Sequence, residues 1–168
     1  MANNSSAAYL AAAGLSVGLV LMAPPRNGDP LLVWNETPSV KIGLYWIAHR
    51  SPQRGDVSAV RLPLRIVRLA DGRGYLPLSA LLLKPIAAAG GDRVCRWHKR
   101  ILINGVARSL AAAHDRAGRA LPSWLGCRTL RAGELFLIGQ SSDSFDSRYF
   151  GVVSATRVIG QAVPLWTR

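Results

Sequence analysis

Acidic residues are scarce in this chain of 168 residues. Only 9 Asp and Glu stand against 21 Lys and Arg, which leaves a formal net charge of +12. That imbalance indicates either an acidic partner, such as nucleic acid or anionic lipid, or a basic surface that is simply solvated. We favour the solvated surface, because the charges are scattered. The densest cluster consists of Arg93, Arg96, Lys99 and Arg100.

Cysteines are also few, and their placement limits what they can do. Cys95 and Cys127 lie far apart in sequence and have no histidine at ligand spacing. This argues against a zinc site, and we expect neither a metal ion nor another cofactor. In an exported domain the two thiols could form one disulfide, which stabilises by about 3–4 kcal/mol in the chain-entropy description. In a cytosolic domain they would be two ordinary thiols.

Two common catalytic motifs are missing. Beyond its first 25 residues, the chain has no Gly-x-Ser-x-Gly nucleophile elbow. It also has no phosphate-binding loop, because Gly90-Gly91-Asp92 lacks the Lys-Ser/Thr ending. The histidines stand alone in basic or loop contexts and are expected at the surface. They are His49, His98 and His114.

One long apolar run is present, from Ala7 to Ala23, and Pro24-Pro25 ends it. Its length is close to the lower limit of about 17 residues for a membrane span. A membrane anchor, a signal peptide and a buried core helix are the competing interpretations. Residues 1–6 contain no Lys or Arg, which a signal peptide normally carries. We therefore favour a retained anchor over residues 1–25, with an exported and cleaved form second.

Beyond this segment, short strand patterns alternate with turn residues, and no helical period is sustained. The expected strands are 31–34, 44–48, 57–62, 93–97, 101–103, 135–138 and 158–165, with one short helix over 64–70. Asn104-Gly105 predicts a tight hairpin. Residues 107–131 are predicted as a long surface loop and 140–150 as a polar loop. Residues 26–168 should therefore be a mostly β domain, folded as one coiled antiparallel sheet or barrel-like body.

Two side chains have the chemistry of a nucleophile and its base. Pro38 stiffens a turn around Ser39, just before an aromatic strand, and such a turn could present a nucleophile. Lys84 shares a strand face with Leu82 and Ile86. A lysine in apolar surroundings has a lowered pKa, so its neutral amine can accept a serine proton. The plainer alternatives are a surface turn and a snorkelling lysine.

Four segments, taken in their order along the chain, indicate a known family. They are Thr37-Pro38-Ser39-Val40-Lys41-Ile42-Gly43-Leu44-Tyr45, Arg54-Gly55-Asp56-Val57, Leu83-Lys84-Pro85-Ile86 with Gly90-Gly91-Asp92, and Ser144-Phe145-Asp146-Ser147-Arg148-Tyr149-Phe150-Gly151. Together they resemble the motifs of the bacterial type I signal peptidase family. The nearest resemblance is to its conjugative-transfer branch, the TraF-type pilin-processing peptidases. The stretch Asp115-Arg116-Ala117-Gly118-Arg119 with Leu121-Pro122 is also similar to that branch.

The resemblance implies a role for each matched residue. Ser39 would be the nucleophile and Lys84 the general base. Ser144 would hydrogen-bond the lysine and orient it. Thr37 would join the backbone N–H of Ser39 in the oxyanion hole, where donors act on the charge that develops in the transition state.

The remaining matches leave one role open and show some departures. Asp146 matches a position that is catalytic in the TraF branch but structural in ordinary signal peptidases, where it pairs with the arginine matched by Arg148. The family's usual Met, Pro and Arg are replaced by Val40, Ile42 and Pro85. These changes suit the conjugative branch better than a general secretory peptidase.

The resemblance implies a serine endopeptidase held in the bacterial inner membrane, with its catalytic domain in the periplasm. Its partners would be a membrane-held pilin or preprotein precursor and the lipid bilayer, and we do not expect nucleic acid. Either water or the substrate's own amine would resolve the acyl-enzyme. The alternatives are a general signal peptidase that cleaves many exported preproteins, and a non-enzymatic basic component that binds DNA or lipid.

Overall fold

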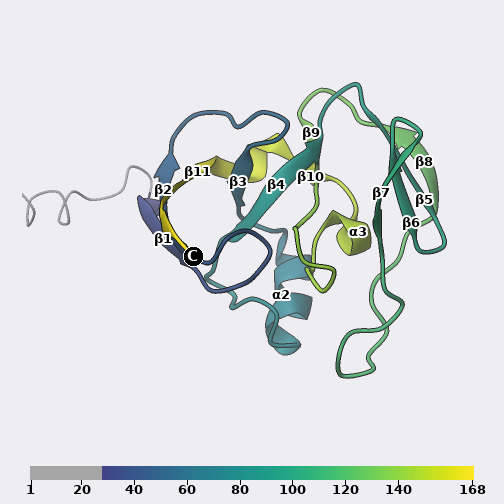
Figure 1. Ribbon diagram of the computed structural model, residues 1–168, viewed down its shortest axis with the longest axis horizontal. Coiled ribbons are helices and arrows are strands. Elements are labelled where there is room, and N and C mark those ends of the chain that lie inside the picture. Colours follow the sequence, from purple (N-terminus) through teal and green to yellow (C-terminus); the bar gives the residue numbers. More distant parts are fainter. Residues whose placement is uncertain (1–27) are drawn as a thin grey trace, which may run out of the picture. The chain divides into compact units, whose positions relative to one another are not determined.

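The computed structural model describes residues 28–168 of the chain. Leu31–Arg168 forms one compact unit made mostly of antiparallel strands (Figure 1). The predicted anchor over residues 1–25 lies outside the described residues. Within the described part, no helix is both long enough and apolar enough to cross a membrane.

Seven strands form the larger sheet, in the order β1-β2-β11-β3-β4-β9-β10, and every neighbouring pair is antiparallel. Their bounds are Leu32–Asn35 (β1), Gly43–Ala48 (β2), Val57–Val60 (β3), Leu82–Ala88 (β4), Glu134–Leu137 (β9), Val153–Ser154 (β10) and Val158–Thr167 (β11). In Figure 1 the sheet curls, so that β1, β2 and β11 turn around one end while β4 and β9 cross the middle. The last strand of the chain thus lies inside the sheet, between β2 and β3.

Four further strands form a second sheet, in the order β7-β6-β5-β8. Their bounds are Arg93–Trp97 (β5), Arg100–Ile103 (β6), Val106–Leu110 (β7) and Gly126–Thr129 (β8). The mostly β class with coiled antiparallel sheets is therefore confirmed, but the strands divide between two sheets rather than one. Asn104-Gly105 forms the predicted hairpin between β6 and β7, with positive φ of 51° and 82°, as a type I′ turn requires.

Two predicted loops contain regular structure. Strands β7 and β8 occupy the two ends of the segment 107–131, so the prediction of one continuous loop there is wrong. These strands pair through the backbone at the exposed edges of the second sheet, so they need no apolar alternation. The predicted polar loop 140–150 ends in a short helix, α3, over Ser147–Phe150. Its first turn begins at Asp146, whose side chain accepts the backbone N–H of Arg148.

Helix α2, Leu64–Gly72, forms where the sequence predicts it. Its buried residues lie at helical spacing and are Ile66, Val67 and Ala70. The first two pack with Val60, Leu82 and Leu137 of the larger sheet in one apolar cluster. Each such aliphatic side chain stabilises the fold by about 1.5–3 kcal/mol when fully buried. The burial of α2 thus holds one face of β4, the strand that carries Lys84.

The densest basic cluster is not a single surface patch. Arg93, Lys99 and Arg100 are exposed, as the solvated interpretation predicts. Arg96 is only 4% exposed, and its guanidinium donates to the carbonyls of His98, at 3.0 Å, and of Arg148. Arg96 therefore attaches the second sheet to α3, because a buried guanidinium needs acceptors for its N–H groups.

A disulfide joins the two cysteines, as the exported-domain interpretation expects. Cys95 on β5 and Cys127 on β8 lie at directly opposed positions, with Cα atoms 4.0 Å apart. The bridge covalently links an edge strand of the second sheet to its neighbour. Short edge strands have little else to hold them, so this bridge secures β8.

Replacing both cysteines with serine is expected to lower the free energy of unfolding by about 3–4 kcal/mol, because the unfolded chain is no longer restricted by the bridge. Urea unfolding of the variant beside the oxidised wild-type protein measures this change. Thiol titration of the denatured but unreduced wild-type protein should find no free cysteine. Two reactive thiols would contradict the bridge.

Candidate active site

Ser39 lies in the loop that joins β1 to β2, residues 36–42, here called the nucleophile loop. Asn35, before the loop, and Gly43, after it, are directly opposite each other in the β1–β2 pair. Gly43 has φ +149°, and a Cβ there would approach the Cα of Thr167 to 2.8 Å. Only glycine therefore lets β2 begin directly beside β11. Thr37 is exposed on this loop, whereas Ser39 is 4% exposed and faces inward.

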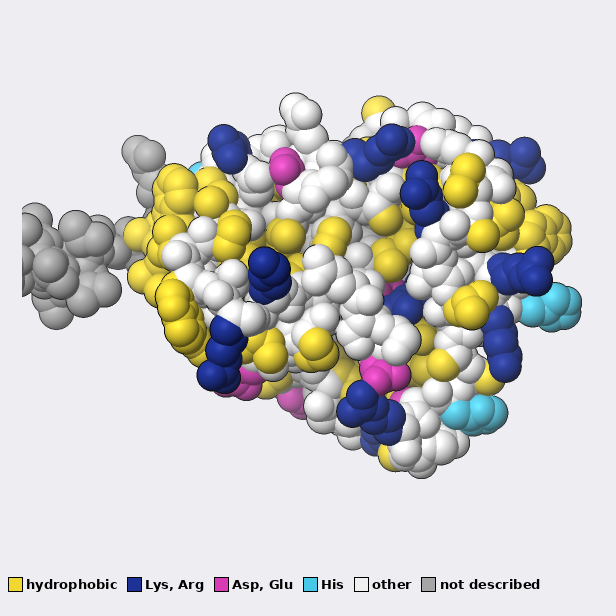
Figure 2. Space-filling model, viewed as in Figure 1, with side chains coloured by type: hydrophobic (Ala, Val, Ile, Leu, Met, Phe, Trp, Pro, Cys, Tyr) yellow, Lys and Arg dark blue, Asp and Glu magenta, His cyan; other side chains and the backbone are white. Residues whose placement is uncertain are grey.

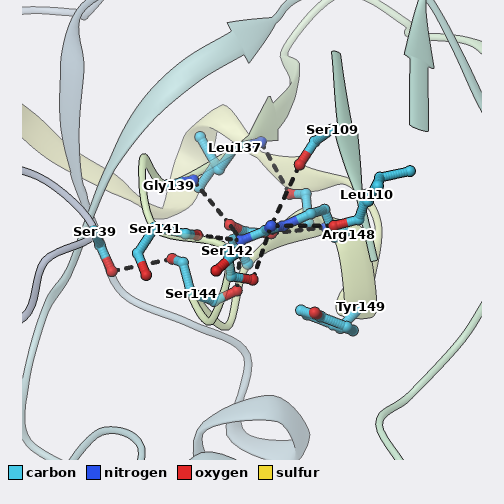
Figure 3. A network of polar contacts seen from close by, with 12 residues as sticks. Ser39, Ser109, Leu110, Leu137, Gly139, Ser141, Ser142, Ser144, Arg148 and Tyr149 are labelled. Carbon is cyan, nitrogen blue, oxygen red and sulfur yellow. Dashed lines mark hydrogen bonds and ion pairs between the residues drawn. The ribbon is translucent and has the colours of Figure 1, made fainter. Parts of the chain in front are cut away.

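The hydroxyl of Ser39 takes part in a chain of three hydroxyl groups. Its Oγ lies 3.0 Å from Ser144 Oγ and 3.3 Å from Thr37 Oγ1. Ser144 belongs to the loop between β9 and α3, residues 138–146, here called the serine loop. The backbone N–H of Gln140 donates to the carbonyl of Ser39 at 2.8 Å. This bond fastens the nucleophile loop to the serine loop, and Figure 3 shows the two serines side by side.

Lys84 reaches the same place from β4, and its residue is only 3% exposed. Its Cδ lies 3.3 Å from the position that a Cβ on Gly139 would occupy, and the Cβ of Ser144 lies 2.8 Å from that position. Within residues 28–168, Ser39 bonds Ser144, and no direct hydrogen bond joins Lys84 to either serine. The structure thus gathers the predicted nucleophile, base and orienting serine around Gly139.

The environment of Lys84 favours its neutral form. Burial lowers the pKa of Lys84 from 10.5 to about 8. Desolvation of the ammonium is the largest cause, the negative charge of Asp146 opposes it, and the positive charge of Arg148 adds to it. A base with a pKa near the working pH combines a useful neutral fraction with adequate basicity.

Asp146 and Arg148 form a buried ion pair, with residues 0% and 1% exposed. Arg148 Nε lies 2.8 Å from Asp146 Oδ1 and Nη2 lies 2.9 Å from Oδ2, while the N–H of Gly139 donates to Oδ2 at 2.8 Å. The guanidinium also donates to four backbone carbonyls, which Figure 3 shows around it. These belong to Leu110, Ser141, Ser142 and Ser144. The pair therefore holds the backbone of the serine loop from inside.

The Asp115–Arg119 motif supports the serine loop from outside. Asp115 accepts the hydroxyl of Tyr75 and the Nε–H of Arg119, the latter at 2.7 Å. Its neighbour Arg116 forms an ion pair with Asp143 of the serine loop. The segment between β7 and β8 is thus tied both to the end of α2 and to the loop that carries Ser144.

The other two matched motifs contact each other. Arg54 Nη1 lies 3.1 Å from Asp92 Oδ1 at the surface. Asp92 also accepts the N–H of Ala89 at 3.0 Å, and this bond is the largest cause that lowers its pKa. These residues brace the turn that follows β4. The three histidines named above are all exposed, as predicted.

Asn35 and Gly139 contact the predicted site residues but were not predicted from the sequence. Gly139 allows Ser144 and Lys84 to approach each other across its missing side chain. Asn35 lies behind the nucleophile loop, where its side chain makes five hydrogen bonds. An Asn that ends a strand before a Pro-containing turn is the only signal that pointed to it. The close approach of Ser144 and Lys84 to Gly139 has no comparable signal in the sequence.

A family model described as signal peptidase, peptidase S26, matches residues 6–166. The chain belongs to this signal peptidase family. A plasmid transfer protein TraF from Escherichia coli is 30% identical over 145 residues, which cover 79% of this chain and 81% of that protein. A conjugal transfer protein TraF from Agrobacterium fabrum is 35% identical over 144 residues, with coverage of 79% and 81%.

A solved signal peptidase I from Enterococcus faecalis is 22% identical, covers 68% of this chain and 98% of its own, and has a TM-score of 0.38. The family match and the TraF relatives together confirm the resemblance inferred from the four motifs. The chain is a TraF-type member of the signal peptidase family, and the family's activity is that of a peptidase.

Gly139→Ala is expected to reduce the activity of the peptidase while leaving it folded. The added methyl group would overlap the Oγ and Cβ of Ser144, so the whole Ser144 side chain must shift away from Ser39. Loss of that hydrogen bond should slow cleavage by about tenfold or more. Cleavage rate and thermal midpoint, measured together, check this expectation. Gly72→Ala meets open space and is the matched control; equal activity in both variants would contradict the described packing.

Lys84→Met is expected to abolish activity and to change how stability depends on pH. Between pH 8 and 10.5 the unfolded state binds the lysine proton and the folded state does not, so wild-type stability rises with pH across this window. The variant should lack this rise and should be more stable than wild type below pH 8. Urea unfolding at pH 7 and pH 9.5 measures both effects. Lys99→Met, at an exposed lysine, is the control, and stability curves of Lys84→Met and wild type that stay parallel would argue against a buried amine.

Proposed function

We propose that this peptidase cleaves a membrane-held precursor through a Ser39–Lys84 dyad. The observation that carries the proposal is the hydroxyl of Ser39, 3.0 Å from that of Ser144, beside a buried lysine with a pKa of about 8. A neutral amine shielded from water is a competent base for a serine hydroxyl. Ser-Lys pairs are an established variant of the serine triad.

In the proposed reaction, Ser39 Oγ attacks the scissile carbonyl carbon and passes its proton to the amine of Lys84. The resulting ammonium donates that proton to the leaving amine, so an acyl-enzyme and a new amino terminus form. Ser144 orients the amine and the attacking hydroxyl. The backbone N–H of Ser39 and the hydroxyl of Thr37 donate to the oxyanion, and loss of one such donor typically costs about 3–4 kcal/mol in the transition state.

Asp146 has a supporting role in this scheme. Both of its carboxylate oxygens are occupied by Arg148, and one also holds the N–H of Gly139. A carboxylate so engaged is poorly placed to take a proton from substrate. We assign it to fixing the serine loop and to limiting how far the pKa of Lys84 falls.

An exposed apolar surface supports contact with a lipid bilayer. Its members, which are 42–57% exposed, are Leu32, Trp34, Trp46, Leu165 and Trp166. They lie on β1, β2 and β11, and Figure 2 shows hydrophobic side chains gathered over that end of the unit. Trp34 and Trp166 stack with ring centroids 5.7 Å apart. Tryptophan and tyrosine are enriched at the boundary between water and lipid.

The position of this apolar surface suits a membrane-held substrate. The nucleophile loop directly joins β1 to β2, so Ser39 lies at the margin of the surface. Ser39 also follows Pro25, at the end of the apolar run, by 14 residues, a short reach for an extended chain. We therefore place the domain on the periplasmic face of the bacterial inner membrane, a compartment in which the Cys95–Cys127 disulfide is stable.

The proposed substrate is the pilin precursor of a conjugative transfer apparatus. The relatives from Escherichia coli and Agrobacterium fabrum are named as plasmid and conjugal transfer proteins, which supports a substrate from that system. Either water or the amine of the substrate itself can resolve the acyl-enzyme. The second route forms a peptide bond within the product and closes a ring.

Co-expression with the pilin precursor of the same transfer operon tests this function. The wild-type protein should convert the precursor to a shorter product, whereas Ser39→Ala and Lys84→Met should leave it intact. Intact-mass measurement of the product identifies the cleavage site, and a mass lower by one water indicates ring closure. Ser51→Ala, at an exposed serine, is the control and should process normally. Normal processing by Ser39→Ala would refute the dyad, and cleavage of many unrelated preproteins would favour a general signal peptidase.

A further inference from the structure

The side chain of Asn35 spans the loop that carries the proposed nucleophile. It is the last residue of β1, is 7% exposed and pairs with Gly43 across the mouth of the loop. Its Nδ2 donates to the carbonyls of Thr37, Lys41 and Val40 at 2.7, 3.0 and 3.2 Å. One amide group thus binds backbone carbonyls that lie before and after Ser39 in the sequence.

The other end of the same amide holds Thr37. Oδ1 of Asn35 accepts the hydroxyl of Thr37 at 3.1 Å and its backbone N–H at 3.4 Å. The amide cannot be reversed, because its oxygen would then face three carbonyl oxygens. Its orientation therefore follows from the contacts themselves.

The single proton of the Thr37 hydroxyl has two acceptors within reach. They are Asn35 Oδ1 at 3.1 Å and Ser39 Oγ at 3.3 Å. A hydroxyl donates only one proton, so it cannot satisfy both at once. Neither arrangement uses the proton of Ser39, so the Ser39 hydroxyl remains able to donate it elsewhere. When an oxyanion forms, a rotation about the Cβ–Oγ1 bond can redirect the Thr37 proton to it.

We propose that Asn35 is a positioning residue for the nucleophile loop. It holds the Thr37 and Ser39 hydroxyls in the mutual arrangement that the acylation step needs, and it keeps the Thr37 proton available for the oxyanion. This inference rests on the proposed function, because it assigns Asn35 to the same reaction. Asn35 acts through Thr37 and Ser39 and touches no substrate.

Asn35→Ala should therefore lower kcat for precursor cleavage by about 10- to 100-fold, with KM changed less than twofold, because the lost interactions matter in the transition state. Thr37→Val should lower kcat by about 100-fold. If Asn35 acts through Thr37, the double variant should be within about threefold of Thr37→Val, since residues that act as one unit are not additive. Glu36→Ala, at an exposed neighbour in the same loop, is the control and should match wild type.

Two results would overturn the inference. One is an undiminished kcat in Asn35→Ala, and the other is a double variant whose losses multiply. If Asn35→Ala does not fold, Asn35→Ser, which retains one donor, takes its place. An undiminished kcat in Asn35→Ser, or multiplying losses when it is combined with Thr37→Val, would then overturn the inference. An inactive Ser39→Ala beside a fully active Asn35→Ala removes this inference alone. Normal cleavage by Ser39→Ala would instead remove the proposed function, and this inference with it.

Discussion

The burial of one lysine amine is the constraint on which the rest of the structure depends. Lys84 lies on the same strand face as Leu82 and Ile86, and both of these belong to the apolar cluster beneath α2. A charged ammonium in that position is costly, and this cost lowers the pKa of Lys84 to about 8. The property that destabilises the folded state below this pH is also the one that makes Lys84 a base. A site that costs stability is common where a side chain must do chemistry.

The charge of Asp146 offsets part of that cost, and its ion pair with Arg148 organises the surroundings. Arg148 bonds the carbonyls of the serine loop, and Arg96 of the second sheet donates to the carbonyl of Arg148. The indole of Trp124 donates to the carbonyl of Ser147 at 3.1 Å. The second sheet, α3 and the serine loop are thus joined around one buried ion pair. Removing one member of such a pair typically costs about 3–5 kcal/mol, because the other charge remains buried and unpaired.

The sequence predicted the strands with strong apolar alternation and the helix α2, because their side chains face a core. It did not predict β7 and β8, whose residues are largely exposed and held by backbone pairing and the Cys95–Cys127 bridge. The motifs located Ser39, Lys84 and Ser144. They could not reveal Gly139 or Asn35, whose roles arise from close approach and loop geometry after folding. The local sequence pattern indicates which face of a strand or helix a residue occupies. It does not indicate which distant loop that residue contacts.

The central claim is that Lys84 carries a neutral amine at a pH where other lysines are charged. The most direct test is a pH titration by NMR of the protein with ¹³C-labelled lysine side chains, with the Lys84 signal assigned by its loss in Lys84→Met. The account predicts one lysine signal with a midpoint near 8, distinct from the remaining lysines. A Lys84 signal that titrates near the ordinary value of 10.5 would contradict it.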